Sequence, residues 1–180
     1  GIADVSGHGV GAALIMTATR AYIRSLASTL TPLDRLAAEL NRLLFADLHD
    51  EHFVTMVLVL LDERSGALTW ANFGHPTAYV LDRSGEVKAE LKSGCMPLGL
   101  FPDFSCTPGP TITLECGDTL VLLTDGILEA ASTQGDEFGS TSVLNVVRSV
   151  IDRPAREIAD SIIAATQSFL DGQSQNDDLT

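Results

Sequence analysis

A strand–turn–strand pattern over residues 53–75 restricts the folds open to this chain more strongly than any other segment. The run FVTMVLVLLD is apolar and β-branched, ERSG supplies a turn signal, and ALTWANFGH follows as the returning strand. The pattern recurs in TAYVLD, RSG and EVKAEL, and a third hairpin is expected from TITLE, CGD and TLVLLTDG. Consecutive hairpins, in place of alternating strands and helices, predict antiparallel sheet.

Helical patterns stand on both sides of these hairpins. The first, over residues 10–28, is expected to bury one stripe of apolar residues: Leu14, Met16, Ala18, Tyr22, Ile23 and Leu26. Thr31 is expected to cap a second helix, with Pro32 at its first helical position. Helical spacing returns over residues 140–152 and 154–170. These patterns predict an α+β fold with helices outside an antiparallel sheet or pair of sheets.

Length and composition predict a single domain over residues 1–180. The residues are 45% hydrophobic and show no internal repeat, linker or low-complexity tract, so the chain can bury one substantial core. The sequence lacks an initiator Met, begins in what resembles the tail of a strand, and stops where an apolar run starts after NDD. We therefore expect a fragment of a longer chain, truncated at the N-terminus and near the C-terminus.

The charge balance excludes one class of partner and favours another. The net charge is −13, and 11 scattered Lys and Arg residues do not supply the basic cluster that binds nucleic acid, so none is expected as a partner. An acidic chain favours cation binding instead. No apolar run is long enough to span a membrane, and the start of the chain does not resemble a signal peptide, so a cytoplasmic location is predicted.

The cysteines indicate neither a disulfide framework nor a zinc site. Cys95, Cys106 and Cys116 are odd in number and none stands in a CxxC motif. We expect them to be reduced thiols without a chemical role.

Carboxylates recur at the ends of predicted strands. Asp4 follows GIA and precedes a glycine-rich turn, Asp125 follows TLVLLT, and Asp177 and Asp178 precede the apolar start LT. A glycine-rich turn that leads into a helix commonly binds phosphate, and a bare carboxylate there would repel it. A metal ion between them resolves the conflict, because carboxylates from neighbouring strand ends can converge and hard oxygen ligands suit Mg²⁺ or Mn²⁺.

The motifs resemble those of a known family when they are taken together and in order. ADVSGHGVGAALIM, GALTWANFGHP, MPLGL, GDTLVLLTDGILEA, DEFG and NDDLT resemble the metal-dependent protein phosphatases of type 2C, especially the bacterial stage II sporulation protein E and RsbU type. The resemblance covers nearly the whole chain. It implies two packed antiparallel β-sheets flanked by helix pairs, an α-β-β-α sandwich. It also implies two Mn²⁺ or Mg²⁺ ions that activate a water for attack on phosphoserine or phosphothreonine.

The resemblance also implies roles for particular residues. Asp4 corresponds to the carboxylate that bridges both metals, and the Val5 carbonyl to a ligand of the second metal. Asp125 and Asp177 correspond to ligands of the first metal, and with Asp4 they form the expected catalytic set. We assign this position to Asp177 because the family motif places the ligand three residues before a Thr, here Thr180. Asp178 is the other candidate for the same position.

The sequence departs from the family pattern at two points, and the residue roles of the family do not apply there directly. The eukaryotic enzymes have a His two residues after the bridging Asp that can protonate the leaving oxygen, whereas His8 stands four residues after Asp4. His8 is therefore either a general acid or a residue that shapes the turn. An acidic segment that supplies a further metal contact would precede residue 1. We expect one bound ion or none in this chain and two in the complete domain.

The sequence also allows other functions. His49 and His52 form either a metal-ligand pair or a solvated helix end. A nucleotide-binding module would need a second strand ending in an acidic residue where this chain has a helical pattern. A pseudophosphatase that only binds a partner is the stronger alternative. The resemblance further implies a phosphorylated anti-anti-sigma-type protein as substrate, an upstream sensory or receiver domain, and a homodimer through the N-terminal helices as one candidate assembly.

Overall fold

The computed structural model describes residues 1–29, 32–48, 52–173 and 177–180. The chain divides into two compact units. Unit 1 comprises residues 1–77 and 91–114, and unit 2 comprises residues 78–90 and 115–180. Each unit contains one antiparallel sheet and one pair of long helices.

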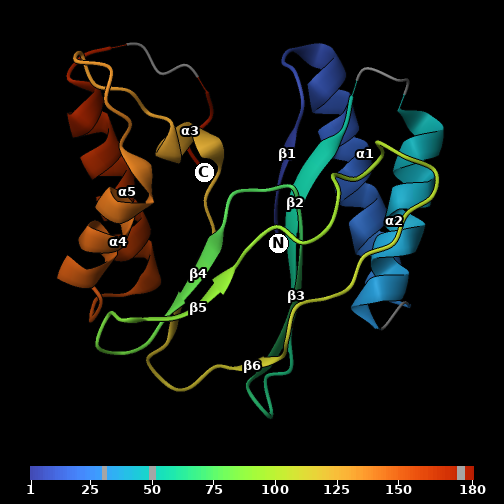
Figure 1. Ribbon diagram of the computed structural model, residues 1–180, viewed down its shortest axis with the longest axis horizontal. Helices are drawn as coiled ribbons and strands as arrows, with labels where there is room; N and C mark the ends of the chain where they lie inside the picture. The colour runs from blue at the N-terminus through green and yellow to red at the C-terminus, as the bar shows by residue number, and fades with distance from the viewer. Residues whose placement is uncertain (30–31, 49–51, 174–176) are drawn as a thin grey trace. The chain divides into compact units, whose positions relative to one another are not determined.

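The sheet of unit 1 has four antiparallel strands in the order β1-β2-β3-β6 (Figure 1). Val57 lies near its centre, opposite Ile2 of the first strand and Asn72 of the third. Branched and aromatic residues dominate the two long strands, which explains why this hairpin forms. The strands are β1 (Ile2–Val5), β2 (Val54–Leu61), β3 (Ala67–Phe73) and β6 (Ile112–Thr113).

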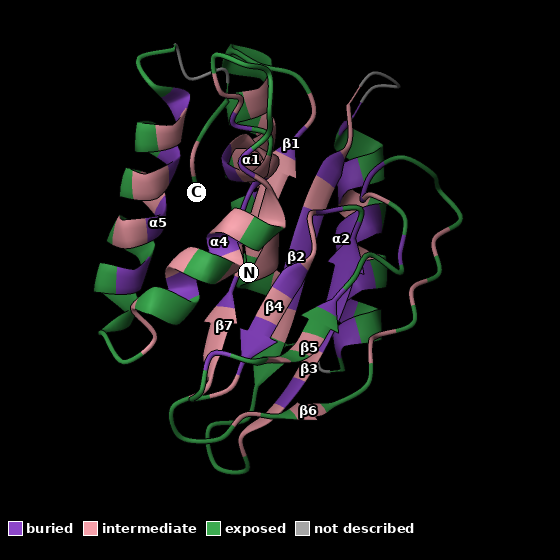
Figure 2. Ribbon diagram, turned by 60° about the vertical axis from the view of Figure 1, so that its left-hand side comes forward, coloured by how far each residue is buried: buried purple, intermediate pink, exposed green. Residues whose placement is uncertain are grey.

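Two helices, α1 (Val10–Leu26) and α2 (Leu33–Asp47), lie side by side on one face of this sheet (Figure 1). The buried residues of α2 follow one side of the helix, as the purple bands in Figure 2 show. The Tyr22 hydroxyl donates a hydrogen bond to the Asp47 carboxylate and links the two helices. This bond raises the pKa of Tyr22. The core of unit 1 includes Leu36, Leu40, Leu44, Val54, Met56 and Phe73.

Unit 2 is built on a three-stranded sheet in the order β5-β4-β7, with helices that pack around their own core. The Phe138 and Phe169 rings meet edge to face, with centroids 5.3 Å apart, and Val143, Val147 and Ile162 are buried beside them. The elements are β4 (Ala78–Leu81), β5 (Val87–Leu91), β7 (Thr119–Val121), α3 (Asp125–Leu128), α4 (Gly139–Ser149) and α5 (Ala155–Leu170).

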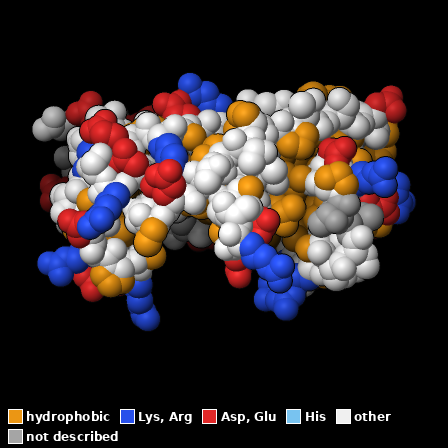
Figure 3. All heavy atoms as spheres, turned by 90° about the horizontal axis from the view of Figure 1, so that it is seen from below, with side chains coloured by type: hydrophobic (Ala, Val, Ile, Leu, Met, Phe, Trp, Pro, Cys, Tyr) orange, Lys and Arg blue, Asp and Glu red, His pale blue; other side chains and the backbone are white. Residues whose placement is uncertain are grey.

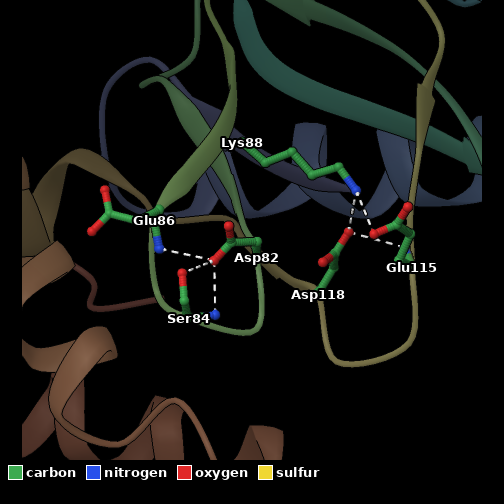
Figure 4. A network of polar contacts seen from close by, with 6 residues as sticks. All are labelled: Asp82, Ser84, Glu86, Lys88, Glu115 and Asp118. Carbon is green, nitrogen blue, oxygen red and sulfur yellow. Dashed lines mark hydrogen bonds and ion pairs between the residues drawn. The ribbon is translucent and has the colours of Figure 1, made fainter.

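Two polar clusters fix the turns of this small sheet (Figure 4). Asp82 Oδ1 accepts hydrogen bonds from the Ser84 hydroxyl at 2.6 Å and from the Glu86 N–H at 3.1 Å, which closes the turn between β4 and β5. Lys88 Nζ lies 2.7 Å from Asp118 and 3.7 Å from Glu115, at the turn before β7. The Asp118 side chain is 3% exposed and the Lys88 side chain is 29% exposed, so their ion pair is only partly shielded from water.

The predicted α+β class is confirmed, since each of the two antiparallel sheets is accompanied by a helix pair. The prediction of a third hairpin over residues 111–126 is wrong. Ile112 of β6 pairs with Leu68 of β3, and Leu120 of β7 pairs with Val80 of β4, so the two segments belong to different sheets. Short-range patterns identify the strands, but the partner of each strand comes from distant sequence.

Three local predictions also need correction. The second helix begins at Leu33, one residue later than expected, and Thr31 lies outside the described residues. Leu14 of α1 is 65% exposed, although it was assigned to the buried stripe. Cys95 and Cys106 form a disulfide, contrary to the prediction of reduced thiols, whereas Cys116 is free and exposed. The chain brings the first two cysteines together because Cys95 pairs with the end of β3 and Cys106 packs against the same core.

Among the described residues, none of the helices is long and apolar enough to cross a membrane.

Candidate functional site

The first part of the candidate site lies at the end of β1 in unit 1. Within the part of the chain that is described, β1 is an edge strand whose neighbour is β2. Asp4 is half-buried opposite Thr55, and Val5 is buried opposite Val54. The strand therefore holds the Asp4 carboxylate at a defined register next to the glycine-rich turn.

The turn after β1 is tied to the beginning of β2. The Ser6 N–H donates to the Phe53 carbonyl at 3.0 Å, and the Phe53 N–H donates to the Ser6 hydroxyl oxygen at 2.9 Å. His52 Nδ1 lies 3.0 Å from the Ser6 carbonyl oxygen, to which it donates. Gly7 and Gly9 have φ near +85°, a conformation that favours glycine, and α1 begins directly afterwards.

The structure describes the surroundings of two of the histidines for which the sequence suggests a role. His52 supports the turn through Ser6, and His49 lies outside the described residues, so the metal-ligand pair stays a prediction. His8 is exposed within the turn. A role for His8 as general acid likewise stays a prediction.

The second part of the candidate site lies in unit 2, after β7. Thr124 is buried and directly precedes Asp125, the first residue of the short helix α3. The Asp125 carboxylate accepts a hydrogen bond from the Gly126 N–H at 3.0 Å and is half-buried. The strand thus delivers Asp125 to a fixed turn with its carboxylate partly accessible.

The C-terminal residues pack against this turn. The Thr124 hydroxyl donates to the Asp178 carbonyl at 3.0 Å, and the Thr124 N–H donates to the Thr180 carbonyl at 3.0 Å. A Cβ atom on Gly126 would collide with the Asp178 carbonyl oxygen and would lie 3.3 Å from the carbonyl carbon of Asp177. Only glycine allows the two main chains to approach this closely.

The structure therefore brings some of the predicted residues together and leaves the others in a separate unit. The turn of Asp125 contacts the segment that carries Asp177 and Asp178. Asp4 and Val5 belong to unit 1. No group of three or more His, Cys, Asp or Glu side chains placed to hold a metal ion occurs among the described residues. A shared metal centre remains a prediction.

The chemistry of the donor set nevertheless suits a hard divalent cation. Carboxylate and main-chain carbonyl oxygens are the ligands that Mg²⁺ and Mn²⁺ prefer. Asp125, Asp177 and Asp178 are half-buried or exposed, so a hydrated ion can reach them. On the face that Figure 3 shows, Lys and Arg side chains stand among Asp and Glu side chains.

Sequence reasoning missed the residues that support these carboxylates. Thr124 and Gly126 flank Asp125 in the motif TDG, and their roles follow only from the contact with Asp178. A contact between Thr55 and His75 was also missed: the Thr55 hydroxyl oxygen lies 2.9 Å from His75 Nδ1. The glycine and proline around His75 signal a turn, but they do not signal a contact with β2.

The chain is similar in sequence to one protein family and to several known proteins. A sequence model of stage II sporulation protein E (SpoIIE) matches residues 1–180. The chain is 26% identical over 206 residues to protein IcfG of Synechocystis sp. (strain ATCC 27184 / PCC 6803 / Kazusa), and 27% identical over 182 residues to phosphoserine phosphatase RsbP of Bacillus subtilis (strain 168). The alignments include 99% and 98% of this chain, respectively.

A solved structure, the SiaA-PP2C domain of Pseudomonas aeruginosa, has the same fold with a TM-score of 0.85 and 27% identity. The match covers 98% of this chain and 71% of that one. The chain spans only 32% of the length of IcfG and 43% of the length of RsbP, so most of each relative lies outside the aligned part.

Proposed function

Because the chain belongs to the stage II sporulation protein E (SpoIIE) family, we propose that it is the catalytic part of a Mn²⁺- or Mg²⁺-dependent protein phosphatase that hydrolyses phosphoserine or phosphothreonine. The observation that carries the proposal is the Thr124–Asp178 contact, which holds the turn of Asp125 beside Asp177 in unit 2. The relative RsbP is a phosphoserine phosphatase, which supports the substrate class.

The proposed mechanism assigns a role to each carboxylate. Asp4, Asp125 and Asp177 would hold the first metal ion, with Asp178 as the competing candidate for the position of Asp177. Asp4 would also hold the second ion, together with the Val5 carbonyl. When bound, the ions would supply an activated water and neutralise charge on the phosphoryl oxygens. The rigid TDG turn would keep the Asp125 carboxylate fixed during the reaction. No covalent nucleophile is required.

The proposal also includes a substrate and an assembly. We propose a serine-phosphorylated, anti-anti-sigma-type regulator as substrate, with the phosphatase part under the control of an upstream sensory or receiver domain in the cytoplasm. A homodimer through α1 is supported by its exposed apolar residues, since Val10 is 78% exposed and Leu14 is 65% exposed. The corresponding roles in stress response and sigma-factor regulation rest on the resemblance to the RsbU type.

The test is hydrolysis of a phosphoserine peptide by the natural full-length protein with Mn²⁺. Asp125→Ala should lower turnover by at least about 100-fold without unfolding unit 2, because a lost ligand disturbs the activated water more than the core. Asp160→Ala, an exposed carboxylate on α5, is the matched control and should retain activity.

The outcomes separate the enzyme from the pseudophosphatase. Full activity of Asp125→Ala would refute the assigned site, and an inactive wild-type protein that still binds a phosphorylated partner would favour the binding module. A larger loss of activity in Asp178→Ala than in Asp177→Ala would assign the metal-ligand role to Asp178 instead of Asp177. Calorimetric titration of residues 1–180 should find at most one bound Mn²⁺, because few protein ligands remain for the second ion.

A further inference from the structure

A buried polar network in unit 1 contacts Thr55, the residue that pairs with Asp4, and has no role in the proposed mechanism. Asn72 and His75 are 1% and 3% exposed, in a region otherwise built from apolar side chains. Burial of polar groups is costly unless they are hydrogen-bonded, so such a network needs a structural or functional reason.

The turn after β3 fixes the position of the imidazole. Asn72 Oδ1 accepts the His75 N–H at 2.9 Å, while Asn72 Nδ2 donates to the Leu91 carbonyl at 2.9 Å. Gly74 has φ of +71°, and a Cβ there would lie 2.7 Å from the Pro97 ring. The backbone of His75 is therefore held by contacts that do not involve its ring.

The ring in turn contacts β2 at one position. His75 Nδ1 lies 2.9 Å from Thr55 Oγ1, and Thr55 is the residue of β2 that pairs with Asp4 of β1. Side chains of directly opposite residues in an antiparallel pair stand on the same face, with Cβ atoms about 4.5–5.5 Å apart. Thr55 thus contacts the buried imidazole and shares a sheet face with Asp4.

We propose that Thr55 and His75 are positioning residues for Asp4. If His75 Nδ1–H donates to Thr55 Oγ1, the hydroxyl proton of Thr55 is left to donate to the Asp4 carboxylate across the strand pair. This bond would hold one carboxylate oxygen and direct the other toward a bound cation. Groups that orient metal ligands in this way typically change metal affinity or activity about 10- to 100-fold when they are removed.

A purely structural role is the competing explanation, and it makes a different prediction. If the pair only closes the turn, every change at Thr55 should act through stability. If the pair orients Asp4, removing the hydroxyl should weaken metal binding while the fold persists. Thr55→Val removes the hydroxyl at nearly constant shape, Thr55→Ser keeps it, and Thr69→Val on β3 is the matched control.

The inference rests on the proposed function, because it assumes that Asp4 is a metal ligand. The experiment is calorimetric titration of Mn²⁺ into each variant of the chain, with urea unfolding in parallel. Thr55→Val should weaken Mn²⁺ affinity about 10-fold, whereas Thr55→Ser and Thr69→Val should stay within about two-fold of wild type. In the active full-length protein, the Mn²⁺ concentration for half-activation should rise with Thr55→Val while the KM for phosphopeptide is unchanged.

The variant Asp4→Asn distinguishes failure of the proposed metal site from failure of the positioning role alone. Wild-type Mn²⁺ affinity in Asp4→Asn would overturn the proposed metal site, and the positioning role with it. Loss of affinity in Asp4→Asn together with unchanged affinity in Thr55→Val would overturn the positioning role alone. Equal loss of affinity in Thr55→Val and Thr55→Ser, accompanied by lower unfolding midpoints, would establish the structural role instead.

Discussion

The Thr124 hydroxyl donates a hydrogen bond to the main-chain carbonyl of Asp178 at 3.0 Å and accepts one from the Thr180 N–H at 3.2 Å. One buried side chain therefore joins the turn of Asp125 to the segment of Asp177. The two carboxylates come from positions far apart in the sequence, and this hydroxyl is one of the groups that joins their segments.

Replacing the hydroxyl tests that dependence. Thr124→Val keeps the shape of the side chain but leaves the Asp178 carbonyl and the Thr180 N–H without this partner, which should cost about 1–3 kcal/mol locally. We expect faster hydrogen exchange at the Thr180 amide and weaker activation by Mn²⁺, while the core of unit 2 stays folded. Thr124→Ser should retain both properties. Unchanged exchange in Thr124→Val would show that other contacts hold the segment.

The close approach at Gly126 gives a second test. Gly126→Ala places a methyl group against the Asp178 carbonyl oxygen, so the C-terminal segment must move away from Asp125. Phosphatase activity should fall at least about 10-fold, because misplacement of a catalytic group by about 1 Å is enough to do this. Gly11→Ala on α1 is the matched control, since nothing lies within 4 Å of the added methyl group. Its activity should not change, and equal activity of the two variants would contradict the proposed role of this contact.

The strands were predictable because their signals are local. The β-branched residues from Val54 to Leu61 and the turn signal after them specify the hairpin of β2 and β3 without help from distant residues. The pairing of Ile112 with Leu68 was not predictable in this way, because each residue is compatible with several partners and tertiary packing selects one. The prediction that Leu14 is buried was wrong for a related reason. Helical periodicity identifies the apolar face of a helix, but it does not show whether another element covers that face.

In the candidate site, too, features with local sequence signals can be separated from features set by tertiary packing. The turn of Asp125 contacts the segment of Asp177 and Asp178 within unit 2 through Thr124. The convergence of these carboxylates on a metal ion stays a prediction. The network of Thr55 and His75 could not be predicted, because it depends on the register of β2 and on a turn twenty residues later. The convergence of Asp4 with Asp125 remains a prediction from the motif pattern.

The Lys88–Asp118 ion pair predicts a specific pH dependence of stability. Burial, the largest single effect, raises the pKa of Asp118. The hydrogen bonds from Lys88 and from the Glu115 N–H together outweigh it, so the pKa of Asp118 lies below its ordinary value. A carboxylate whose folded pKa is depressed stabilises the fold above its unfolded pKa, and this contribution is lost as the pH falls through the folded pKa. Asp118→Asn should therefore lower the urea midpoint at pH 7, and its difference from wild type should shrink below about pH 4.

The control for this pH series is Asp160→Asn, because Asp160 is exposed on α5. Its urea midpoint should follow that of wild type at every pH. A midpoint difference for Asp118→Asn that is the same at pH 7 and pH 3 would show that packing, rather than the charge of Asp118, stabilises the turn.

The disulfide between Cys95 and Cys106 gives the last prediction. The bond closes a short loop, with a sequence separation of 11, and a loop of this size typically contributes about 2–3 kcal/mol by restricting the unfolded chain. The native fold should persist after reduction, because the Cys95 N–H donates to the Asn72 carbonyl at 3.1 Å and Leu98 exchanges main-chain hydrogen bonds with Val54. Dithiothreitol or Cys106→Ser should therefore lower the urea midpoint of unit 1 without changing its circular dichroism at low urea. Cys116→Ser, at an exposed thiol, should change neither, and equal midpoints for the oxidised and reduced chain would show that the bond adds no stability.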